Sequence, residues 1–448
     1  MTHFGHPEHN PPGKPDGYGE TRFGLATFQK CFFVRSCNKE RAPSLVRDSR
    51  GASQMFSIRA RRTYLCSSFL ILTTFLTAAP TLNSENRKDI EALTSGREWD
   101  KLLHQAQHGN ARAQAQVGIA FLRGEGVKQD FSEARKWLTR AAEQADPLAE
   151  HNLGVMCYAG LGEDRSSSAA AKWFEKAAAA GLPEAQFNAA RLYETGTGVT
   201  QNFGRALKLY EQAAEQGYAR AQNNLGRMYE SGEGIAREPQ AAIAWYLKSA
   251  EQGNAIGEFD LGSMYWHGNG VAQDYVKAAK WFALAAQQGH TKAQLALGDL
   301  YRLGWGVAMD NEAAALWLSK AAEHGDAIAQ CKLGILYLTG QGVVIDDSLA
   351  AKWFSKAAEQ GNRDAQANLA SLYEVGRGVP RDLSSAYLWR LLSSDGIEPK
   401  QNDKLLALAQ QISNEDIAAA QHLASDWRRA REAAAGPQLE NFDAVPAY

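Results

Sequence analysis

The stretch that decides the fold runs from residue 221 to 254 and reads AQNNLGRMYESGEGIAREPQAAIAWYLKSAEQGN. Its first half places apolar residues at i, i+4, i+7 and i+8, namely Ala221, Leu225, Met228 and Tyr229. That spacing puts them on one face of an α-helix. After a Gly-Glu-Gly turn, a second helical pattern directs Ala242, Trp245, Ser249 and Ala250 inward. The stretch therefore predicts two amphipathic helices joined by a glycine turn.

The same pattern recurs at a constant period along most of the chain. The first glycine of the Gly-X-Gly turn appears every 36 residues, at Gly124, Gly160, Gly196, Gly232, Gly268, Gly304, Gly340 and Gly376. A helix pair of this size cannot bury its apolar face alone, whereas stacked pairs bury a continuous core. Eight copies without an insertion therefore predict a helical solenoid.

Glycine-rich turns also occur in phosphate-binding loops, but the context here differs. Such loops follow a strand and open a helix, and the P-loop version carries Lys-Ser/Thr. Each turn in this chain follows a helix and lacks that pair. We interpret the turns as structural. An acidic residue six positions after the first glycine is expected to cap the second helix in six copies: Asp130, Glu238, Asp274, Asp310, Asp346 and Asp382.

Residues at the same position of successive repeats, here called a column, are expected to support packing at two further positions. The position of Gly226 is Gly or Ala in every copy, which lets a neighbouring helix approach closely. The position of Trp245 is Trp in seven copies and Leu209 in the third, and we expect this column to be buried.

The combined pattern AxxxLGxxYxxGxGVxxDxxxAxxWxxKAAEQG resembles the Sel1-like repeat, a relative of the tetratricopeptide repeat. The resemblance implies an all-α, right-handed α-solenoid, a superhelix of eight 36-residue helix-turn-helix repeats over residues 112–397. Residues 80–111 resemble a linker with an N-terminal capping half-repeat, and residues 398–435 a C-terminal helical cap. Ser413 and Asp416 open a helix of that cap like a capping box. Residues 436–448 are expected to be disordered.

The N-terminal region has the features of an export signal. Arg59, Arg61 and Arg62 precede an apolar run and then small residues, which predicts a signal peptide over residues 55–79. Its apolar centre is shorter than the roughly 20 residues of a membrane span. We expect Met55 to be the true start, with residues 1–54 an over-extended or disordered segment. The alternative is a signal anchor that keeps residues 63–84 in the inner membrane.

Charge and cysteine content exclude several classes of protein. Residues 1–79 carry a net charge of +6, which leaves −8 for the remainder. An acidic body argues against nucleic-acid binding, which requires a surplus of Lys and Arg. Only Cys157 and Cys331 lie beyond the signal, and five stacked repeats keep them too far apart for a disulfide.

No pattern of residues indicates catalysis or a bound metal or cofactor. His104 and His108 lie one helical turn apart, but the segment offers no third ligand. The cysteine-rich branch of the family is associated with β-lactam binding or hydrolysis, and its members carry a cysteine pair in each repeat that this chain lacks. We therefore predict that the chain is not an enzyme. A hydrolase of that branch is the weaker alternative.

The remaining candidates lie on the surface formed by the first helices, which the resemblance implies is concave and binds proteins. Arg191 and Arg227 share one column and could hold a partner's carboxylate, or could be ordinary solvated charges. Trp266 and His267 form a possible binding site, with burial of Trp266 against the next repeat as the alternative. Trp305 stands at a turn tip, where it could meet a partner or fold back on Arg302 or Leu303.

These features together lead to one expectation. The chain is expected to be a periplasmic or secreted bacterial scaffold or regulator that binds proteins through its concave face. A membrane-anchored envelope assembly component is the alternative. The partner, the pathway and the oligomeric state are not encoded in any pattern that we recognise.

Overall fold

The computed structural model describes residues 96–394 and 402–435. Within these ranges the chain forms nineteen α-helices and no strand. None of these helices is both long and apolar enough to cross a membrane. The predicted signal (residues 55–79), its anchor alternative (63–84), the N-terminal segment (1–54) and the C-terminal tail (436–448) lie outside the described residues. The all-α fold is confirmed for the part that the structure describes.

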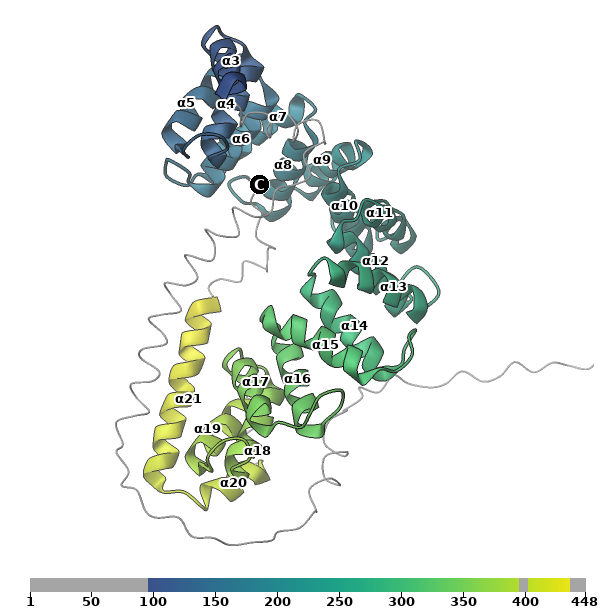
Figure 1. Cartoon of the computed structure of the whole chain (residues 1–448), viewed down its shortest axis with the longest axis vertical. Helices are drawn as coiled ribbons and strands as arrows, with labels where there is room; N and C mark the ends of the chain where they lie inside the picture. The colour runs from purple at the N-terminus through teal and green to yellow at the C-terminus, as the bar shows by residue number, and fades with distance from the viewer. Residues whose placement is uncertain (1–95, 395–401, 436–448) are drawn as a thin grey trace, which may run out of the picture. The chain divides into compact units, whose positions relative to one another are not determined.

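Sixteen of the helices form eight consecutive hairpins, which stack side by side in Figure 1. The first helices of the hairpins are α4 (Ala111–Arg123), α6 (Pro147–Ala159), α8 (Pro183–Thr195), α10 (Ala219–Ser231), α12 (Ala255–His267), α14 (Thr291–Leu303), α16 (Ala327–Thr339) and α18 (Arg363–Val375). The second helices are α5 (Phe131–Ala142), α7 (Ser167–Ala179), α9 (Phe203–Glu215), α11 (Pro239–Glu251), α13 (Tyr275–Gln287), α15 (Asn311–Glu323), α17 (Asp347–Glu359) and α19 (Leu383–Ser393). Each helix contacts its hairpin partner and the next helix along the chain. This is the predicted α-solenoid.

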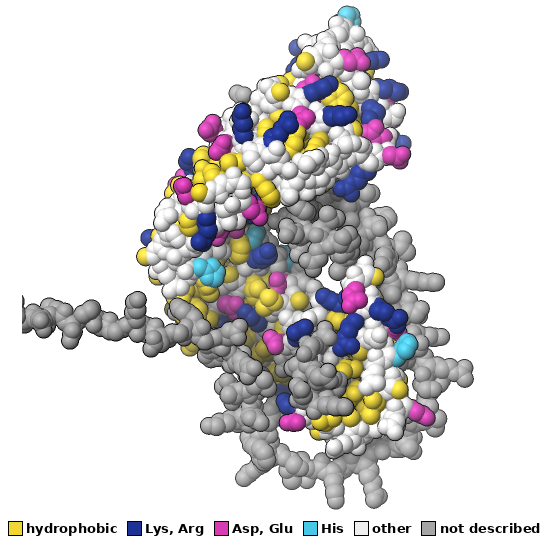
Figure 2. All heavy atoms as spheres, turned by 180° about the vertical axis from the view of Figure 1, so that it is seen from behind, with side chains coloured by type: hydrophobic (Ala, Val, Ile, Leu, Met, Phe, Trp, Pro, Cys, Tyr) yellow, Lys and Arg dark blue, Asp and Glu magenta, His cyan; other side chains and the backbone are white. Residues whose placement is uncertain are grey.

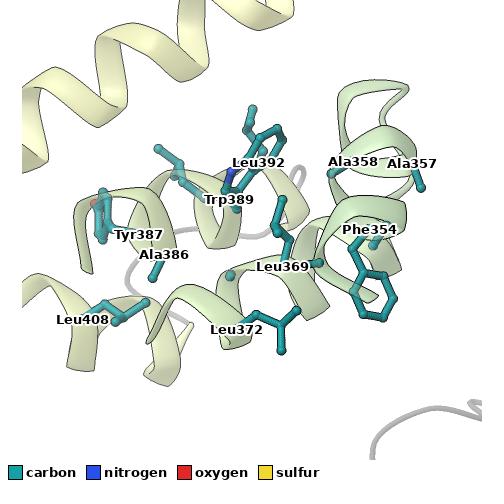
Figure 3. Packing of buried hydrophobic residues seen from close by; sticks show 14 of the residues in the cluster. Phe354, Ala357, Ala358, Leu369, Leu372, Ala386, Tyr387, Trp389, Leu392 and Leu408 are labelled. Atoms are coloured by element: carbon teal, nitrogen blue, oxygen red, sulfur yellow. The ribbon is translucent and has the colours of Figure 1, made fainter. Parts of the chain in front are cut away.

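Additional helices cover the two ends of the array. Before the first repeat, α3 (Gly96–Gln107) packs on α4, where the rings of Trp99 and Phe121 meet edge to face at 6.0 Å. After the last repeat come α20 (Asp403–Ala409) and α21 (Asn414–Ala435). Leu408 and Ala424 of these helices share a buried cluster with Tyr387 of α19, part of which is drawn in Figure 3. The terminal helices thus cover apolar surface that no further repeat would bury.

Five of the six acidic residues that were expected to cap a second helix do so. Asp310 Oδ1, for example, accepts a hydrogen bond of 2.9 Å from the backbone N–H of Ala313. The other four aspartates do the same, and Ser166 and Asn202 cap the two helices that lack an acidic residue. Glu238 is the exception, because its side chain makes no bond to the helix that it precedes. Its longer side chain is a poorer match for the cap geometry.

The glycine turns join neighbouring repeats as well as the two helices of one repeat. The first glycine, such as Gly304 at φ +69°, ends the first helix in the left-handed conformation. The second glycine is pressed against the preceding repeat. A methyl group at Gly306 would lie 2.1 Å from the carbonyl oxygen of Tyr275, the first residue of the preceding second helix. This inter-repeat contact extends our interpretation of the turn from the sequence.

The expected burial of the tryptophan column is confirmed for Trp137 and Trp389, each 8% exposed, but the other five tryptophans are only half-buried. The deepest position of the second helix is the next residue, such as Tyr246, which is 1% exposed. It packs on the small-residue column, because a methyl group at Gly226 would lie 2.7 Å from a carbon of the Tyr246 ring. Trp245 itself is half-buried at the edge of the core, and the Lys248 ammonium lies 3.8 Å from its ring centroid. Both positions fall on the same helical face, so periodicity alone did not separate them.

A ladder of glutamines, which we did not predict, forms hydrogen bonds between consecutive repeats. Gln222 Nε2 donates a 3.1 Å bond to the carbonyl of Ala214 in the preceding repeat, and its Oε1 accepts a 2.7 Å bond from Gln252. The glutamines that make the same bond to the preceding helix are Gln114, Gln186, Gln294, Gln330 and Gln366. Glu150 and Glu258 interrupt the ladder, and burial raises the pKa of both carboxyls.

Candidate interaction surface

The first helices present one face that is not used for packing against the second helices. This first-helix face consists of residues 112, 116, 119 and 123 and their copies at intervals of 36 residues. All of them are exposed or half-buried except Asn188. Hydrophobic side chains also reach the surface elsewhere, and Figure 2 shows them in groups between charged ones. The first-helix face itself carries polar side chains together with exposed hydrophobic ones, such as Ile328 and Val375.

Arg227 lies on this face between two carboxylates of its own chain. Its guanidinium binds Glu194 of the preceding repeat and lies 3.3 Å from Glu233 in the turn of its own repeat. Glu194 also accepts a 2.7 Å bond from the buried Tyr210 hydroxyl. The ion pairs hold Arg227 in place while its side chain stays 40% exposed. A partner's carboxylate would therefore have to share Arg227 with Glu194 and Glu233.

Arg191 occupies the same column one repeat earlier but has different surroundings. Its guanidinium carbon lies 6.0 Å from the centre of the Phe187 ring, and the side chain is half-buried. The two arginines therefore do not form an equivalent pair of sites.

Trp266 and Trp305, 39 residues apart in the sequence, meet across the boundary between the fifth and sixth repeats. Their ring centroids are 5.8 Å apart, and the Trp305 ring stacks on Tyr275 at 5.2 Å. Trp266 also contacts Phe282 at 6.0 Å. The Trp305 side chain thus packs against the preceding repeat. It does not fold back on its own helix. It is nevertheless 41% exposed, whereas Trp266 is half-buried.

His267 ends the same helix as Trp266 and is exposed. Trp266, Tyr275, Phe282 and Trp305 form the aromatic cluster, and their ring contacts with one another do not involve His267. The five predicted residues therefore occupy three places. Trp266, His267 and Trp305 lie at the boundary of repeats five and six, and the two arginines lie in repeats three and four.

Asp260 is a residue of the first-helix face that the sequence analysis missed. Asn223 of the preceding repeat donates a 3.0 Å hydrogen bond to its carboxylate. Burial raises the pKa of Asp260 to about 7, helped by the charge of Glu230 and opposed by Asn223 and Arg227. The sequence does show that Asp260 departs from its column, because the same position is Asn in four other repeats (Asn152, Asn188, Asn224 and Asn368).

We expect Asp260→Asn to stabilise the protein above neutral pH. The folded pKa, about 7, lies above the ordinary 3.8, so ionisation penalises the folded state. The contribution of Asp260 to stability should therefore be most favourable below about pH 4 and should fall as the pH rises to about 7. Each pKa unit corresponds to about 1.4 kcal/mol. We expect Asp260→Asn to raise the free energy of unfolding by about 2 kcal/mol at pH 8. This is less than the full pKa shift would give, because Asp260 is only half-buried.

Urea unfolding of wild type and Asp260→Asn between pH 4 and 8 measures this difference. The exposed Asp364, on the same face, supplies the control substitution Asp364→Asn. A difference between Asp260→Asn and wild type that does not change with pH would contradict the assigned burial effect.

Groups that could support chemistry are dispersed in the described residues. Cys157 and Cys331 are free and buried, and burial raises the pKa of the two thiols to about 11 and about 12. His104 and His108 stack with ring centroids 4.0 Å apart, and His108 Nδ1 lies 2.7 Å from the carbonyl oxygen of His104. No group of three or more potential metal ligands is found in the part of the chain that the structure describes.

The hairpins, their glycine turns and their stacking define a helical-repeat solenoid of the kind that presents extended binding surfaces. The Sel1 repeat profile matches this chain eight times, over residues 111–146, 147–182, 183–218, 219–254, 255–290, 291–326, 327–362 and 363–394. The chain therefore belongs to the Sel1 repeat family. Solenoids of this family commonly act as protein-interaction scaffolds.

Two solved structures are similar over most of the chain. One is a protective antigen of uropathogenic Escherichia coli strains, 35% identical, with a TM-score of 0.67, covering 78% of this chain and 75% of its own. The other is a Sel1 repeat protein from Oxalobacter formigenes, 31% identical, with a TM-score of 0.54, covering 75% of this chain and 99% of its own. A search of the curated proteins found no match.

Proposed function

We propose that this protein is an exported scaffold or regulator that binds a partner polypeptide through the first-helix face and the adjoining aromatic cluster. The observation that carries the proposal is the contact of Trp266 with Trp305, which joins two repeats and leaves Trp305 41% exposed. An aromatic ring held by its neighbours loses little conformational entropy when a partner covers it. Partly exposed tryptophans of this kind frequently dominate binding energy.

The fixed charges on the same face support recognition of a polar segment as well. Arg227 is oriented by Glu194 and Glu233, and Lys332 of the seventh repeat binds Asp299 of the sixth. The pairs of Arg227 with Glu194 and of Lys332 with Asp299 cross repeat boundaries, so these side chains are held in a defined order along the array. A partner that lies across several repeats would meet an ordered pattern of charge, which favours specificity.

The location outside the cytoplasm rests on the sequence and on a relative. Residues 55–79 have the order of a signal peptide, and the Escherichia coli relative is described as a protective antigen. We propose a periplasmic or secreted protein. Retention of residues 63–84 as an anchor would make it an envelope component instead. Sequencing the N-terminus of the mature protein distinguishes the two.

The interaction proposal predicts that Trp305→Ala and Trp266→Ala each weaken partner binding at least tenfold, as expected for truncating a binding hot spot. The protein would be expressed with a C-terminal tag, recovered from the envelope fraction, and its co-purifying proteins identified. The affinity of the purified partner would then be measured against each variant.

Leu284→Ala serves as the control, because Leu284 is also exposed but lies on a second helix. Circular dichroism and thermal unfolding establish that the variants remain folded. A partner that binds both tryptophan variants as tightly as wild type would eliminate the aromatic cluster as the binding site.

A further inference from the structure

One column of turn residues has a clear structural role in most repeats. Five residues after the first turn glycine, six repeats carry a polar side chain: Gln129, Arg165, Gln201, Arg237, Gln273 and Arg381. Gln273 Nε2, for example, donates a 2.7 Å hydrogen bond to the carbonyl of Trp266 near the end of the first helix. Four others make the same bond at 2.8 to 3.0 Å. Such bonds satisfy a helix-end carbonyl that has no partner within its helix.

The sixth and seventh repeats depart from this column. Met309 and Ile345 stand there, and neither can donate a hydrogen bond. Their side chains are 68% and 59% exposed, and the neighbouring Val344 is 87% exposed. The substitution of a polar residue by an apolar one therefore loses a hydrogen bond and exposes hydrophobic surface. Neither change favours the stability or solubility of the isolated chain.

The three apolar residues Met309, Val344 and Ile345, here called the turn patch, adjoin a depression. The depression has a volume of about 710 Å³ and is lined by Tyr301, Val307, Ala308, Met309, Asp310, Asn311, Glu312 and Gly342. Gly342 belongs to the seventh repeat, so the depression spans the boundary with the sixth. Val344 follows Gly342 by two residues, a reach of at most about 7 Å along the backbone. The patch and the depression therefore form one surface.

The charge at the rim of the depression is negative. Asp310 and Glu312 line it and are both exposed. Two arginines of this part of the array are paired with other carboxylates: Arg302 of α14 lies 3.8 Å from Asp299, and Arg377 in the turn of the eighth repeat lies 2.7 Å from Asp347. An apolar surface with an acidic rim is complementary to an apolar group that has a positive charge beside it.

We propose that the turn patch binds a segment of the partner polypeptide in which an apolar side chain is followed or preceded by Lys or Arg. The apolar side chain occupies the depression beside Met309, and the basic side chain lies against Asp310 and Glu312. This inference rests on the proposed scaffold function and assigns a chemical class to part of the partner. A second copy of this chain is a poorer occupant, because a two-fold contact through the patch would bring the acidic rims together.

The neighbouring repeats themselves supply the test substitutions, Met309→Gln and Ile345→Arg. Each installs a residue that other repeats carry at the same position, where its side chain bonds to a helix-end carbonyl. The double variant is therefore expected to fold and to melt no lower than wild type. It removes the apolar surface without removing the backbone geometry.

A random decapeptide library displayed on phage would be selected against the full chain. We expect enrichment of sequences that place an apolar residue next to Lys or Arg. By fluorescence polarisation, an enriched peptide should bind the double variant at least tenfold more weakly than wild type. Replacing its basic residue by Glu should weaken binding to a similar degree. Leu316→Gln, which changes an exposed leucine of α15, should bind as wild type does.

Three results would overturn the proposal. One is the absence of enriched sequences, or enrichment of sequences without an apolar–basic pair. Another is equal affinity of the enriched peptide for wild type and the double variant. The third is a concentration-dependent dimer in sedimentation velocity that the double variant abolishes, which would assign the patch to a second copy of the chain.

The outcomes also separate this inference from the scaffold proposal. A purified partner that binds the tryptophan variants normally and is lost with the double variant would keep the scaffold function and move the site to the turn patch. A partner lost only with the tryptophan variants would remove the turn patch and keep the aromatic cluster.

Discussion

Gly342→Ala is expected to destabilise the boundary between the sixth and seventh repeats by about 2 to 5 kcal/mol. Gly342 has φ +74°, and a methyl group there would lie 1.9 Å from the carbonyl oxygen of Asn311. The left-handed conformation costs a non-glycine residue about 1 to 2 kcal/mol. Relieving a clash with backbone costs about 1 to 3 kcal/mol more. Because repeats are stabilised by their neighbours, the effect should be concentrated at this boundary.

Gly325→Ala provides a matched control for this prediction. Gly325 also has a positive φ, +95°, but nothing lies within 4 Å of a methyl group there. It should therefore lose only the conformational contribution of about 1 to 2 kcal/mol. Hydrogen exchange followed by mass spectrometry would measure the opening free energy of peptides from each repeat. Equal losses in the two variants would show that the inter-repeat contact of the turn glycine contributes nothing.

Phe354→Ala is the second substitution expected to have a large effect, about 3 to 5 kcal/mol. Phe354 is fully buried on α17 and lies in the cluster of Figure 3 with Leu369 and Leu372 of α18. It also packs on Gly334 of its own repeat, where a methyl group would lie 2.8 Å from its ring. The glycine leaves no side chain that could move into the space. Alanine at position 354 would therefore leave a cavity between two repeats.

The chain itself provides intermediate and control substitutions. The equivalent residue is Leu138 in the first repeat and Leu318 in the sixth, so Phe354→Leu should cost only about 1 kcal/mol. Leu316→Ala, at a side chain that is 55% exposed, should stay within about 0.5 kcal/mol of wild type. Urea unfolding with local hydrogen exchange would rank the three variants. A Phe354→Ala protein as stable as Leu316→Ala would contradict the packing described here.

Only part of the candidate site could be predicted from the sequence. The sequence alone predicts Trp305, at a turn tip, and Trp266, near the end of a first helix, as candidate binding residues. Their mutual contact could not be predicted, since it depends on the distance between a turn and the helix of the preceding repeat. The ion pairs of Arg227 were missed for the same reason, because Glu194 lies in another repeat. Whether these residues bind a partner remains a prediction.

Comparison of repeats with one another would have revealed two further features. Asp260 replaces the Asn of four other copies, and Met309 and Ile345 replace hydrogen-bonding residues. The departures are visible in the sequence, but their meaning is not. Only the structure shows that the usual residue bonds to a helix-end carbonyl and that its apolar replacements are exposed.

The sequence by itself determined the number of repeats, the two helices of each and the five aspartate caps that begin second helices. These properties depend on periodicity and on residues within one turn of each other, which a linear chain displays directly. The tertiary structure decided which residue of the second helix enters the core, where the second turn glycine packs, and which side chains meet across repeat boundaries. Those contacts depend on how the helices pack in three dimensions, which periodicity does not specify. Tyr246 packs on Gly226 of its own hairpin and is 1% exposed, whereas the adjacent Trp245 is half-buried.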